Sequence, residues 1–348
     1  MPSQPQFSKE NFLRNGALFG HQDQIFLMWG KRSQQEKRPE NQWAVSFQNF
    51  FSEQSSWISF ENNLCLTRSQ AKDLFQSMQV NVSWEELNSD SFNKQFQLTQ
   101  SWIERGRLTK TVPYTFEKAK VQMDSGSIES FISNSLNHEK GFLYGLWDEE
   151  AGVLGLTPET LIEQKTATEF STMALAGTLP LKEFEENPES LTKNKKEIYE
   201  HEQVVEFLSQ KLSFLGEASK QERSVLKTPH LAHLFTAFDL ISEKPVDLVV
   251  NQLHPTPALG CQPSTDWKDY LGEFNKIEER GSFGAPFGFS QNLQNSQFVV
   301  AIRNITWTKD EISIGAGCGV VAESQQNLEW MELKNKRNSV KRIFGIDE

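Results

Sequence analysis

Two short stretches of the chain each carry a pair of glutamates three residues apart: Glu197 and Glu200 in KKEIYEHEQVV, and Glu329 and Glu332 in NLEWMELKNK. On an α-helix, residues three apart lie side by side on one face. Four carboxylates brought together would repel one another unless a cation lay between them. Mg²⁺ suits such a site, because it binds few carboxylates and completes its coordination with water and substrate oxygens. The alternative is that both pairs lie on solvated helix faces, since glutamate is mostly exposed.

The first pair requires a helix, and the clearest helical pattern in the chain covers residues 191–215. Spacings of three and four predict one buried stripe along it, formed by Ile198, His201, Val205, Leu208, Leu212 and Leu215. Glu197 and Glu200 lie beside this stripe, where a helix face can look into a cleft. A final helix, from about Gln326 to Phe344, would carry the second pair.

Strands and helices alternate irregularly along the rest of the chain. We expect a helix over residues 92–103, ended by Gly106, and another near 266–279. Residues 31–42 are polar and predict an exposed loop. Strands are expected at LTKTVPYTF, in the hairpin GFLYGLWDEEAGVLGL, from EFSTMAL into AGT, and at FGAPFGF, SQFVVAIRNITWT and EISIGAG. Without a regular βαβα order, the pattern favours an α+β fold over a doubly wound parallel sheet.

Composition excludes several classes of protein. The length of 348 residues would suit about two domains, and 26 Phe with 9 Trp indicate a globular core. A net charge of −11 argues against nucleic-acid binding and gives no indication of attraction to an anionic membrane surface. No apolar run is long enough to span a membrane, and MPSQPQFSKENF lacks a signal-peptide core. Cys65, Cys261 and Cys318 are scattered, which fits a reducing cytoplasm and excludes a clustered thiolate zinc site. We expect a soluble, cytoplasmic enzyme.

Other segments could bind or react. The glycine-rich GAGCGVV (315–321) follows a strand, and its backbone N–H groups could approach an anion, although glycine turns are common. Arg303 lies in the apolar VVAIRNI, where an unpaired guanidinium would be costly. It therefore pairs with a protein carboxylate or binds an anionic ligand. Thr178 offers a hydroxyl in the small-residue turn AGTLP, and two prolines extend LHPTPALG (253–260).

Together these segments resemble the chorismate-utilising enzymes, the family of isochorismate, anthranilate, aminodeoxychorismate and salicylate synthases. The resemblance covers roughly residues 92–345 in the family's order, through GRLTKTV, GLTPETL, ALAGTLP, KKEIYEHEQVV, LHPTPALG, ERGSFGAPFGF, FVVAIRNI, GAGCGVV and EWMELKNK. It implies an α+β fold, a four-layer sandwich with two central antiparallel sheets flanked by helices. The expectation of two domains then yields to a single domain over residues 1–348, in which 1–91 is the less legible part.

The resemblance also gives the paired glutamates a task. Glu200 and Glu332 match the positions that ligate Mg²⁺ in the family. Glu197 and Glu329 match the positions that support the ion, mainly through bound water. The Mg²⁺ would in turn hold the ring carboxylate of chorismate and cancel charges that repel in a desolvated pocket.

Further positions match groups that contact the substrate. Arg303 and the backbone of Gly317 match those that grip the enolpyruvyl carboxylate, and Lys336 and Thr178 match further contacts. The alternative for Lys336 is a surface pair with Glu332, four residues earlier, worth only ~0.3–0.5 kcal/mol.

Two positions match the family's acid and base. Lys110 matches the base that activates water for attack at C2, and it must be neutral to act, which burial can achieve by lowering its pKa. Glu159, in TPETL, matches the acid that protonates the departing C4 hydroxyl, so its pocket should raise its pKa. The alternatives are an exposed lysine at a strand edge and a turn glutamate after a proline.

The resemblance is greatest to isochorismate synthases. The segment ALAGT holds no lysine before its Gly-Thr pair, where aminodeoxychorismate synthases commonly place a nucleophile. Ala258 and Leu259, in LHPTPALG, would line the site, and ammonia-using relatives often carry glutamine where Lys110 stands. The alternatives are a salicylate synthase, which also eliminates pyruvate, an ammonia-using synthase, or a chorismate-binding module without catalysis. No glutaminase subunit is expected, monomer is the family default, and the product could serve menaquinone, siderophore or salicylate synthesis.

The chain departs from the family pattern at three places. After Lys110 it reads KTVPYT where the family usually has KVVLAR, so Pro113 removes a backbone donor and Thr115 stands in place of an arginine. Cys261 replaces a common glycine, and Ser282 replaces an aromatic residue.

Overall fold

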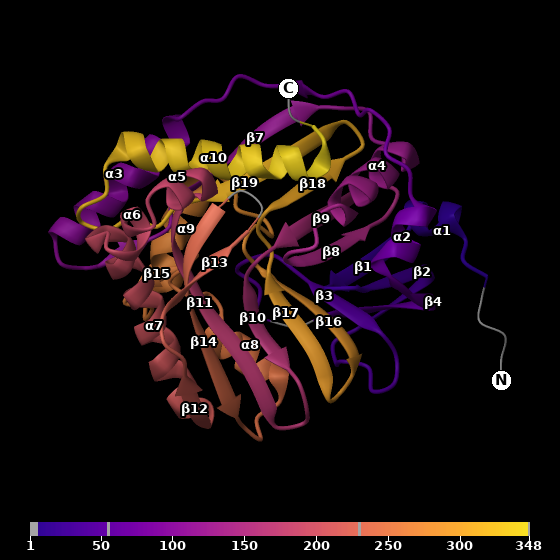
Figure 1. Ribbon diagram of the computed structural model, residues 1–348, viewed down its shortest axis with the longest axis horizontal. Coiled ribbons are helices and arrows are strands. Elements are labelled where there is room, and N and C mark those ends of the chain that lie inside the picture. Colours follow the sequence, from indigo (N-terminus) through magenta and orange to yellow (C-terminus); the bar gives the residue numbers. More distant parts are fainter. Residues whose placement is uncertain (1–5, 54–55, 229–230, 347–348) are drawn as a thin grey trace.

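The structure is a computed structural model that describes residues 6–53, 56–228 and 231–346 (Figure 1). The helices in this part of the chain are α1 (Lys9–Arg14), α2 (Arg68–Leu74), α3 (Asp90–Glu104), α4 (Ser125–Leu136), α5 (Leu181–Glu186), α6 (Glu189–Thr192), α7 (Lys195–Leu215), α8 (Val246–Leu253), α9 (Trp267–Ile277) and α10 (Gln326–Phe344). The strands are β1 (Gly16–His21), β2 (Gln24–Gln35), β3 (Ala44–Phe47), β4 (Trp57–Thr67), β5 (Ser83–Trp84), β6 (Lys110–Thr111), β7 (Tyr114–Lys120), β8 (Phe142–Trp147), β9 (Ala151–Thr157), β10 (Thr160–Gln164), β11 (Glu169–Pro180), β12 (Glu217–Lys220), β13 (Ser224–Lys227), β14 (Leu231–Ile241), β15 (Cys261–Gln262), β16 (Pro286–Asn292), β17 (Asn295–Val300), β18 (Asn304–Thr308) and β19 (Glu311–Gly317).

Antiparallel ladders arrange most strands in two groups. One group follows the order β14, β11, β10, β17 and β16, with β12 and β13 along the outer edge of β14. The other follows β4, β2, β1, β8, β9, β18, β19, β7 and β5. The short strand β3 pairs with β16 on one side and β4 on the other, so it joins the two groups into one hydrogen-bonded network. Strands β6 and β15 form a separate pair.

The three largest apolar cores of the described residues lie between the layers. One joins α7, α8 and α9 to the group that contains β10, β11, β14 and β17. A second, which includes Phe19, Met28, Phe142 and Phe287, lies between the two groups of strands. A third joins α1, α2, α4 and α10 to β1, β2, β8, β9, β18 and β19. Helix, sheet, sheet and helix therefore stack as four layers, and the predicted α+β sandwich is confirmed.

Capping residues mark the start of α7 and the end of α10, the two helices that carry the paired glutamates. Asn194 accepts hydrogen bonds from the backbone of Lys196 and Glu197, so α7 starts at Lys195, and the prediction of one helix from residue 191 is wrong. Helix α10 matches the predicted bounds, and Gly345, at φ 68°, ends it in the left-handed conformation. In Figure 1, α10 crosses above β18 and β19, while α7 runs beside β11 and β14.

Other predictions met mixed outcomes. The helix near residues 92–103, the hairpin of β8 and β9, and the strand through EFSTMAL are confirmed. The loop predicted over 31–42 is wrong at its start, because β2 continues to Gln35. The strand predicted at LTKTVPYTF breaks at Pro113, which has no N–H to donate, so β6 and β7 are separate. The consequence is that Lys110 pairs with Gln262 of β15 and not with the large sheet.

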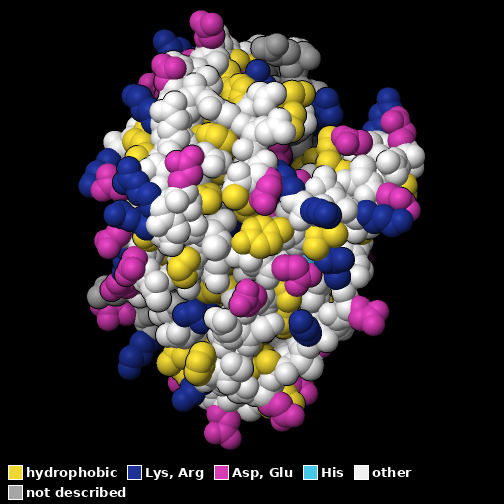
Figure 2. Space-filling view, turned by 90° about the vertical axis from the view of Figure 1, so that its left-hand side faces the viewer, with side chains coloured by type: hydrophobic (Ala, Val, Ile, Leu, Met, Phe, Trp, Pro, Cys, Tyr) yellow, Lys and Arg dark blue, Asp and Glu magenta, His cyan; other side chains and the backbone are white. Residues whose placement is uncertain are grey.

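The face of the molecule drawn in Figure 2 carries charges of both signs. Figure 2 shows Lys and Arg side chains interspersed with Asp and Glu across the face turned toward the viewer. In the described ranges, no helix has the length and apolar character needed to cross a membrane.

Candidate active site

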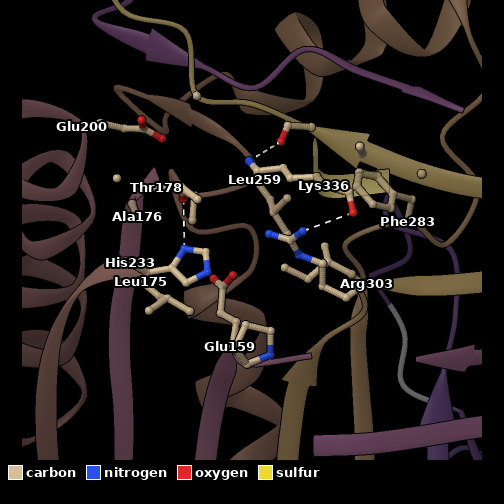
Figure 3. Close-up of a pocket in the computed structure, with 18 residues that line it drawn as sticks. Glu159, Leu175, Ala176, Thr178, Glu200, His233, Leu259, Phe283, Arg303 and Lys336 are labelled. Atoms are coloured by element: carbon tan, nitrogen blue, oxygen red, sulfur yellow. Dashed lines mark hydrogen bonds between the residues drawn. The ribbon is translucent and has the colours of Figure 1, made fainter. Parts of the chain in front are cut away.

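One pocket gathers eight of the predicted site residues from distant parts of the sequence (Figure 3). These residues are Glu159, Thr178, Glu200, Ala258, Leu259, Arg303, Gly317 and Lys336. They come from the β9–β10 turn, the end of β11, α7, the segment after α8, the β17–β18 connection, the end of β19 and α10. The pocket thus lies where both groups of strands meet the two helices that carry the paired glutamates.

Arg303 enters the pocket from a break between strands. The prediction that it lies within a strand is wrong, because β17 ends at Val300 and β18 begins at Asn304. Arg303 adopts φ 55°, an uncommon conformation for a residue with a side chain. Its Nη1 donates to the backbone oxygen of Lys336 at 3.4 Å. Burial lowers the pKa of Arg303 to about 10, against the opposing charges of Glu332 and Glu159.

Glu159 occupies the turn between β9 and β10. Its backbone oxygen accepts a hydrogen bond from Val300 N at 3.0 Å, which ties the turn to β17. Glu159 is a turn residue after a proline, as the alternative had it, but its side chain is only 5 % exposed and faces the pocket. Burial raises the pKa of Glu159 to about 7, although Lys110, Lys336 and Arg303 act to lower it. A carboxyl with this pKa can hold or release a proton near neutral pH.

Lys110 lies behind the pocket, fully buried, with its Nζ 3.1 Å from Glu200 Oε1. The alternative of an exposed lysine at a strand edge is therefore excluded. Burial acts to raise the pKa of Glu200, but the charges of Lys110, Lys196 and Lys336 lower it overall. The close approach depends on Gly319, since a Cβ there would meet Glu200 Oε1 at 2.0 Å and Lys110 Cε at 2.8 Å. One glycine of GAGCGVV thus makes room for an ion pair, a role that its sequence did not indicate.

The other carboxylates meet a lysine that the sequence analysis missed. Lys196 places its Nζ 2.7 Å from Glu329 Oε1 and 3.4 Å from Glu197 Oε1, so it bridges α7 and α10. Glu197 also accepts a hydrogen bond from the backbone N–H of Thr178 at 2.9 Å. Lys196 stands in a KNKK run, which looks like solvated helix surface. Only its position, immediately before Glu197 and one helical turn before Glu200, could have pointed to it.

Glu332 and Lys336 form the remaining ion pair, at 2.7 Å. Lys336 also donates to the backbone oxygen of Gly317 at 2.7 Å, so its ammonium is fixed over the end of β19. Their side chains are 20 % and 17 % exposed, which excludes the alternative of an ordinary surface pair. Burial acts to lower the pKa of Lys336, but the charge of Glu332 outweighs the effect of burial and raises this pKa above its ordinary value.

The carboxylates fit a divalent cation by their charge. Burial and the neighbouring Glu200 raise the pKa of Glu197 to about 7, and burial and Glu332 do the same for Glu329. Both carboxylate oxygens of Glu329 are buried; Oε1 faces Lys196, while Oε2 lacks a hydrogen-bond donor in the described part of the chain. As they stand, no three His, Cys, Asp or Glu side chains among the described residues converge closely enough to hold a metal. The cluster therefore has donors of the right chemistry and a shortage of positive charge, with lysines between the carboxylates.

His233 was also missed. Its Nδ1 lies 2.9 Å from Thr178 Oγ1, and its Nε2 is buried without a partner among the described residues (Figure 3). Burial lowers the pKa of His233 well below its ordinary value, so the ring is neutral beside the cations Arg303 and Lys336. It lies on β14 two residues before Phe235, in an apolar run where a histidine is a recognisable exception.

Comparison with known proteins identifies the class. The family model described as "Chorismate binding enzyme" matches residues 33–345, and the chain belongs to this family. The match begins well before residue 92, where the resemblance in sequence motifs began.

Curated relatives agree with this assignment, and a solved structure shares the fold. The chain is 29 % identical over 262 residues to isochorismate synthase MenF of Bacillus subtilis (strain 168), covering 72 % of this chain and 55 % of that protein. It is 29 % identical over 225 residues to the salicylate biosynthesis isochorismate synthase of Pseudomonas aeruginosa, covering 61 % and 47 %. The chain thus spans about half the length of these relatives. A crystal structure of a putative 2,3-dihydroxybenzoate-specific isochorismate synthase, DhbC, from Bacillus anthracis superposes with a TM-score of 0.81 at 20 % identity, covering 98 % of this chain and 100 % of that one.

Proposed function

We propose that this protein is a Mg²⁺-dependent isochorismate synthase that converts chorismate to isochorismate. The observation that carries the proposal is a buried carboxyl in the pocket, Glu159, whose pKa lies at about 7, together with the buried amine of Lys110 behind the pocket, in contact with the pocket residue Glu200. The reaction needs an acid and a base at the same ring, and these groups supply both. The relatives described above carry the name isochorismate synthase, which supports this choice within the family.

Chorismate is a dianion, and the pocket offers matching cations. Arg303 is buried beside Glu159 and Glu332. An anionic ligand would replace part of the electrostatic interaction between these carboxylates and the guanidinium. We assign the enolpyruvyl carboxylate to Arg303 and the backbone of Gly317, with further contacts to Lys336 and Thr178. The apolar side chains of Ala258 and Leu259 line the same pocket and would pack against the ring.

Mg²⁺ would be held by Glu200 and Glu332, with Glu197 and Glu329 in support. When bound, the ion supplies the positive charge that the carboxylate cluster lacks and that fixes the ring carboxylate of chorismate. The support for this assignment is the raised pKa of Glu197 and Glu329 and the buried Oε2 of Glu329, which has no donor among the described residues. In the described residues, the present partners of these carboxylates include Lys110, Lys196 and Lys336.

The acid and base then have distinct tasks. Lys110, once it has lost its ammonium proton, takes a proton from the water that forms a bond to C2. The C4 hydroxyl departs with its electron pair, the ring double bonds shift, and Glu159 donates the proton that releases it as water. One water enters and one leaves, so the substrate and product are isomers. Lys110 ends protonated and Glu159 ionised, and exchange with solvent restores both.

We also propose that residues 1–348 form one chorismate-utilising domain that acts as a cytoplasmic monomer without a glutaminase subunit. In support, the N-terminal strands β1–β4 belong to the same strand network as the pocket elements. Leu175 and Ala176 line the pocket at the positions before the Gly-Thr pair, where a nucleophilic lysine would be needed for aminodeoxychorismate chemistry.

The test is to incubate the purified protein with chorismate and Mg²⁺, with and without ammonium, and to separate the products. We expect isochorismate in both conditions. Salicylate with pyruvate would instead indicate a salicylate synthase, and an amine product that requires ammonium would contradict the proposal. Tight binding of chorismate without turnover would indicate a chorismate-binding module without catalysis.

A further inference from the structure

Arg280 is a fully buried guanidinium immediately behind the apolar wall of the pocket. It is 1 % exposed, and no carboxylate in the described ranges forms an ion pair with it. Burial lowers the pKa of Arg280 to about 9. A buried cation without a carboxylate is costly, so its hydrogen bonds and ring contacts must account for its presence.

The hydrogen bonds of Arg280 go to two residues of the pocket wall. Its Nη2 donates to the backbone oxygen of Leu259 at 3.1 Å, and its Nε donates to that of Phe283 at 3.0 Å. Leu259 and Phe283 both line the pocket, although they are far apart in the sequence. Gly284 permits the arrangement, because a Cβ there would lie 2.9 Å from Leu259 Cδ1 and 3.0 Å from Arg280 Nη2.

Aromatic rings fix the guanidinium in place. Its Cζ lies 3.4 Å from the ring centroid of Phe50 and 4.8 Å from that of Tyr114. Phe50 comes from the N-terminal part of the chain, and its backbone N–H donates to the oxygen of Gly281 at 2.8 Å. Its backbone oxygen accepts from His254 Nε2 at 2.9 Å, at the start of the segment that leads to Leu259. Phe50 thus connects the segment that holds Leu259 with the segment that holds Phe283.

We propose that Arg280, seated on Phe50, is a positioning residue that sets where Leu259 and Phe283 stand and thereby how the substrate ring lies between the base and the acid. This inference rests on the proposed function, because the ring in question is that of chorismate. It also gives the N-terminal region a role in the site, through Phe50. A guanidinium can span two carbonyls while stacked on a ring, and an ammonium cannot.

The experiment compares Arg280→Lys and Arg280→Met with wild type, measuring kcat and KM for chorismate and the ratio of isochorismate to pyruvate. We expect both variants to lose on the order of 100-fold in kcat/KM, because small misplacements of a reacting ring are this costly. Pyruvate, which the proposed function does not expect from the wild type, should appear among the products of the variants, since it reports a misplaced ring. If lysine restores wild-type values while methionine does not, charge and not position is what matters, and the proposal is overturned.

Arg68→Lys is the matched control. Arg68 is also buried, at 5 % exposure, and it donates to the backbone oxygens of Gln22, Leu136 and His138, away from the pocket. We expect it to lower the thermal midpoint as much as Arg280→Lys does, with kcat/KM within about twofold of wild type. An equal loss of kcat/KM in both variants would show a general effect of stability and overturn the proposal.

A milder variant covers the case in which Arg280→Lys does not fold. Phe50→Leu keeps an apolar side chain but removes the ring under the guanidinium, and we expect roughly a tenfold loss in kcat/KM with the same change in product ratio. Unchanged kinetics in Phe50→Leu would overturn the proposal. Wild-type turnover in the same assay separates the two ideas: without it the proposed function fails, and with it but with normal variants only the role of Arg280 fails.

Discussion

Helix α10 carries a buried cluster of charges on each of two faces, and the two clusters differ in balance. Toward β7, Glu117 lies 2.7 Å from Lys341 and 3.5 Å from Arg337. Arg337 also donates to Thr115 Oγ1 at 2.7 Å, and Glu278 adds a second carboxylate to this face. In the described residues, two cations thus meet two carboxylates, and we call these four the back cluster. Its charges are matched by the protein itself.

The cluster toward α7, which we call the front cluster, is not matched. Among the described residues, three ammonium groups face four carboxylates there: Lys110, Lys196 and Lys336 against Glu197, Glu200, Glu329 and Glu332. The raised pKa of Glu197 and Glu329 follows from this surplus together with burial. The comparison shows that burial of charge alone does not mark a site. A surplus of one sign beside a pocket indicates a ligand of the other sign.

The largest expected effects concern the acid and base beside the front cluster. Lys110→Ala and Glu159→Gln should each lower kcat by on the order of 1,000-fold or more, because each removes a proton transfer that the reaction requires. Chorismate binding in the presence of Mg²⁺ should remain, as measured by calorimetry. Near-normal rates in either variant would contradict its assigned role.

Removing front-cluster carboxylates should weaken Mg²⁺ binding. We expect Glu200→Gln and Glu332→Gln each to reduce Mg²⁺ affinity by roughly 100-fold, since each removes a proposed ligand. The matched variant in the back cluster is Glu117→Gln, which should leave Mg²⁺ affinity within about threefold of wild type. Calorimetric titration with MgCl₂ measures the Mg²⁺ affinity of all three variants. An equal loss of affinity in all three would contradict the distinction between the front and back clusters.

Glu117→Gln should instead cost stability. Breaking a buried ion pair removes the carboxylate from Lys341 and leaves Arg337 with Thr115 and Glu278, and the expected loss in the free energy of unfolding is about 3–5 kcal/mol. Urea unfolding at neutral pH measures this loss. A variant as stable as wild type would show that the back cluster does not hold α10 in place.

The smallest expected effect is a pH dependence of stability at Glu159. Its carboxyl is neutral in both states below about pH 4.5, while between 4.5 and about 7 only the folded state keeps the proton. Folding stability from this group is therefore lost as the pH rises through that window, up to about 3 kcal/mol. A carboxamide has no titrating proton, so Glu159→Gln should gain stability relative to wild type as the pH rises from about 5 to about 8. Urea unfolding at each pH measures the free energy of unfolding of wild type and Glu159→Gln. A difference between the two that does not change with pH would contradict the raised pKa of Glu159.

Parts of the fold could be predicted because local patterns and tertiary packing agree. Helix α10 repeats its buried positions at helical spacing and has Gly345 at its end, so both bounds were predictable. The start of α7 was not, because Leu191 continues the apolar spacing but belongs to α6, and the cap at Asn194 separates the two helices. Pro113 was recognised as a departure, and it does interrupt the strand after Lys110.

The site was predictable where the motifs lie and not where tertiary contacts decide. Glu159, Arg303 and Lys336 were found from their segments, and the pocket brings them together. The left-handed conformation of Arg303 could not be predicted, because the valines and isoleucines of VVAIRNI favour a strand. Lys196 was missed because a lysine in a polar run looks solvated until α10 is placed against it.

The most direct test of the central claim is to follow the solvent oxygen. In the proposed reaction, water activated by Lys110 forms the new bond at C2 while Glu159 releases the C4 hydroxyl. Turnover of chorismate with Mg²⁺ in oxygen-18 water, analysed by mass spectrometry, should therefore give isochorismate with one solvent oxygen, located in the C2 hydroxyl. Isochorismate that retains only the original oxygens would mean that the C4 hydroxyl migrates within the molecule, and it would contradict the assigned roles of both residues.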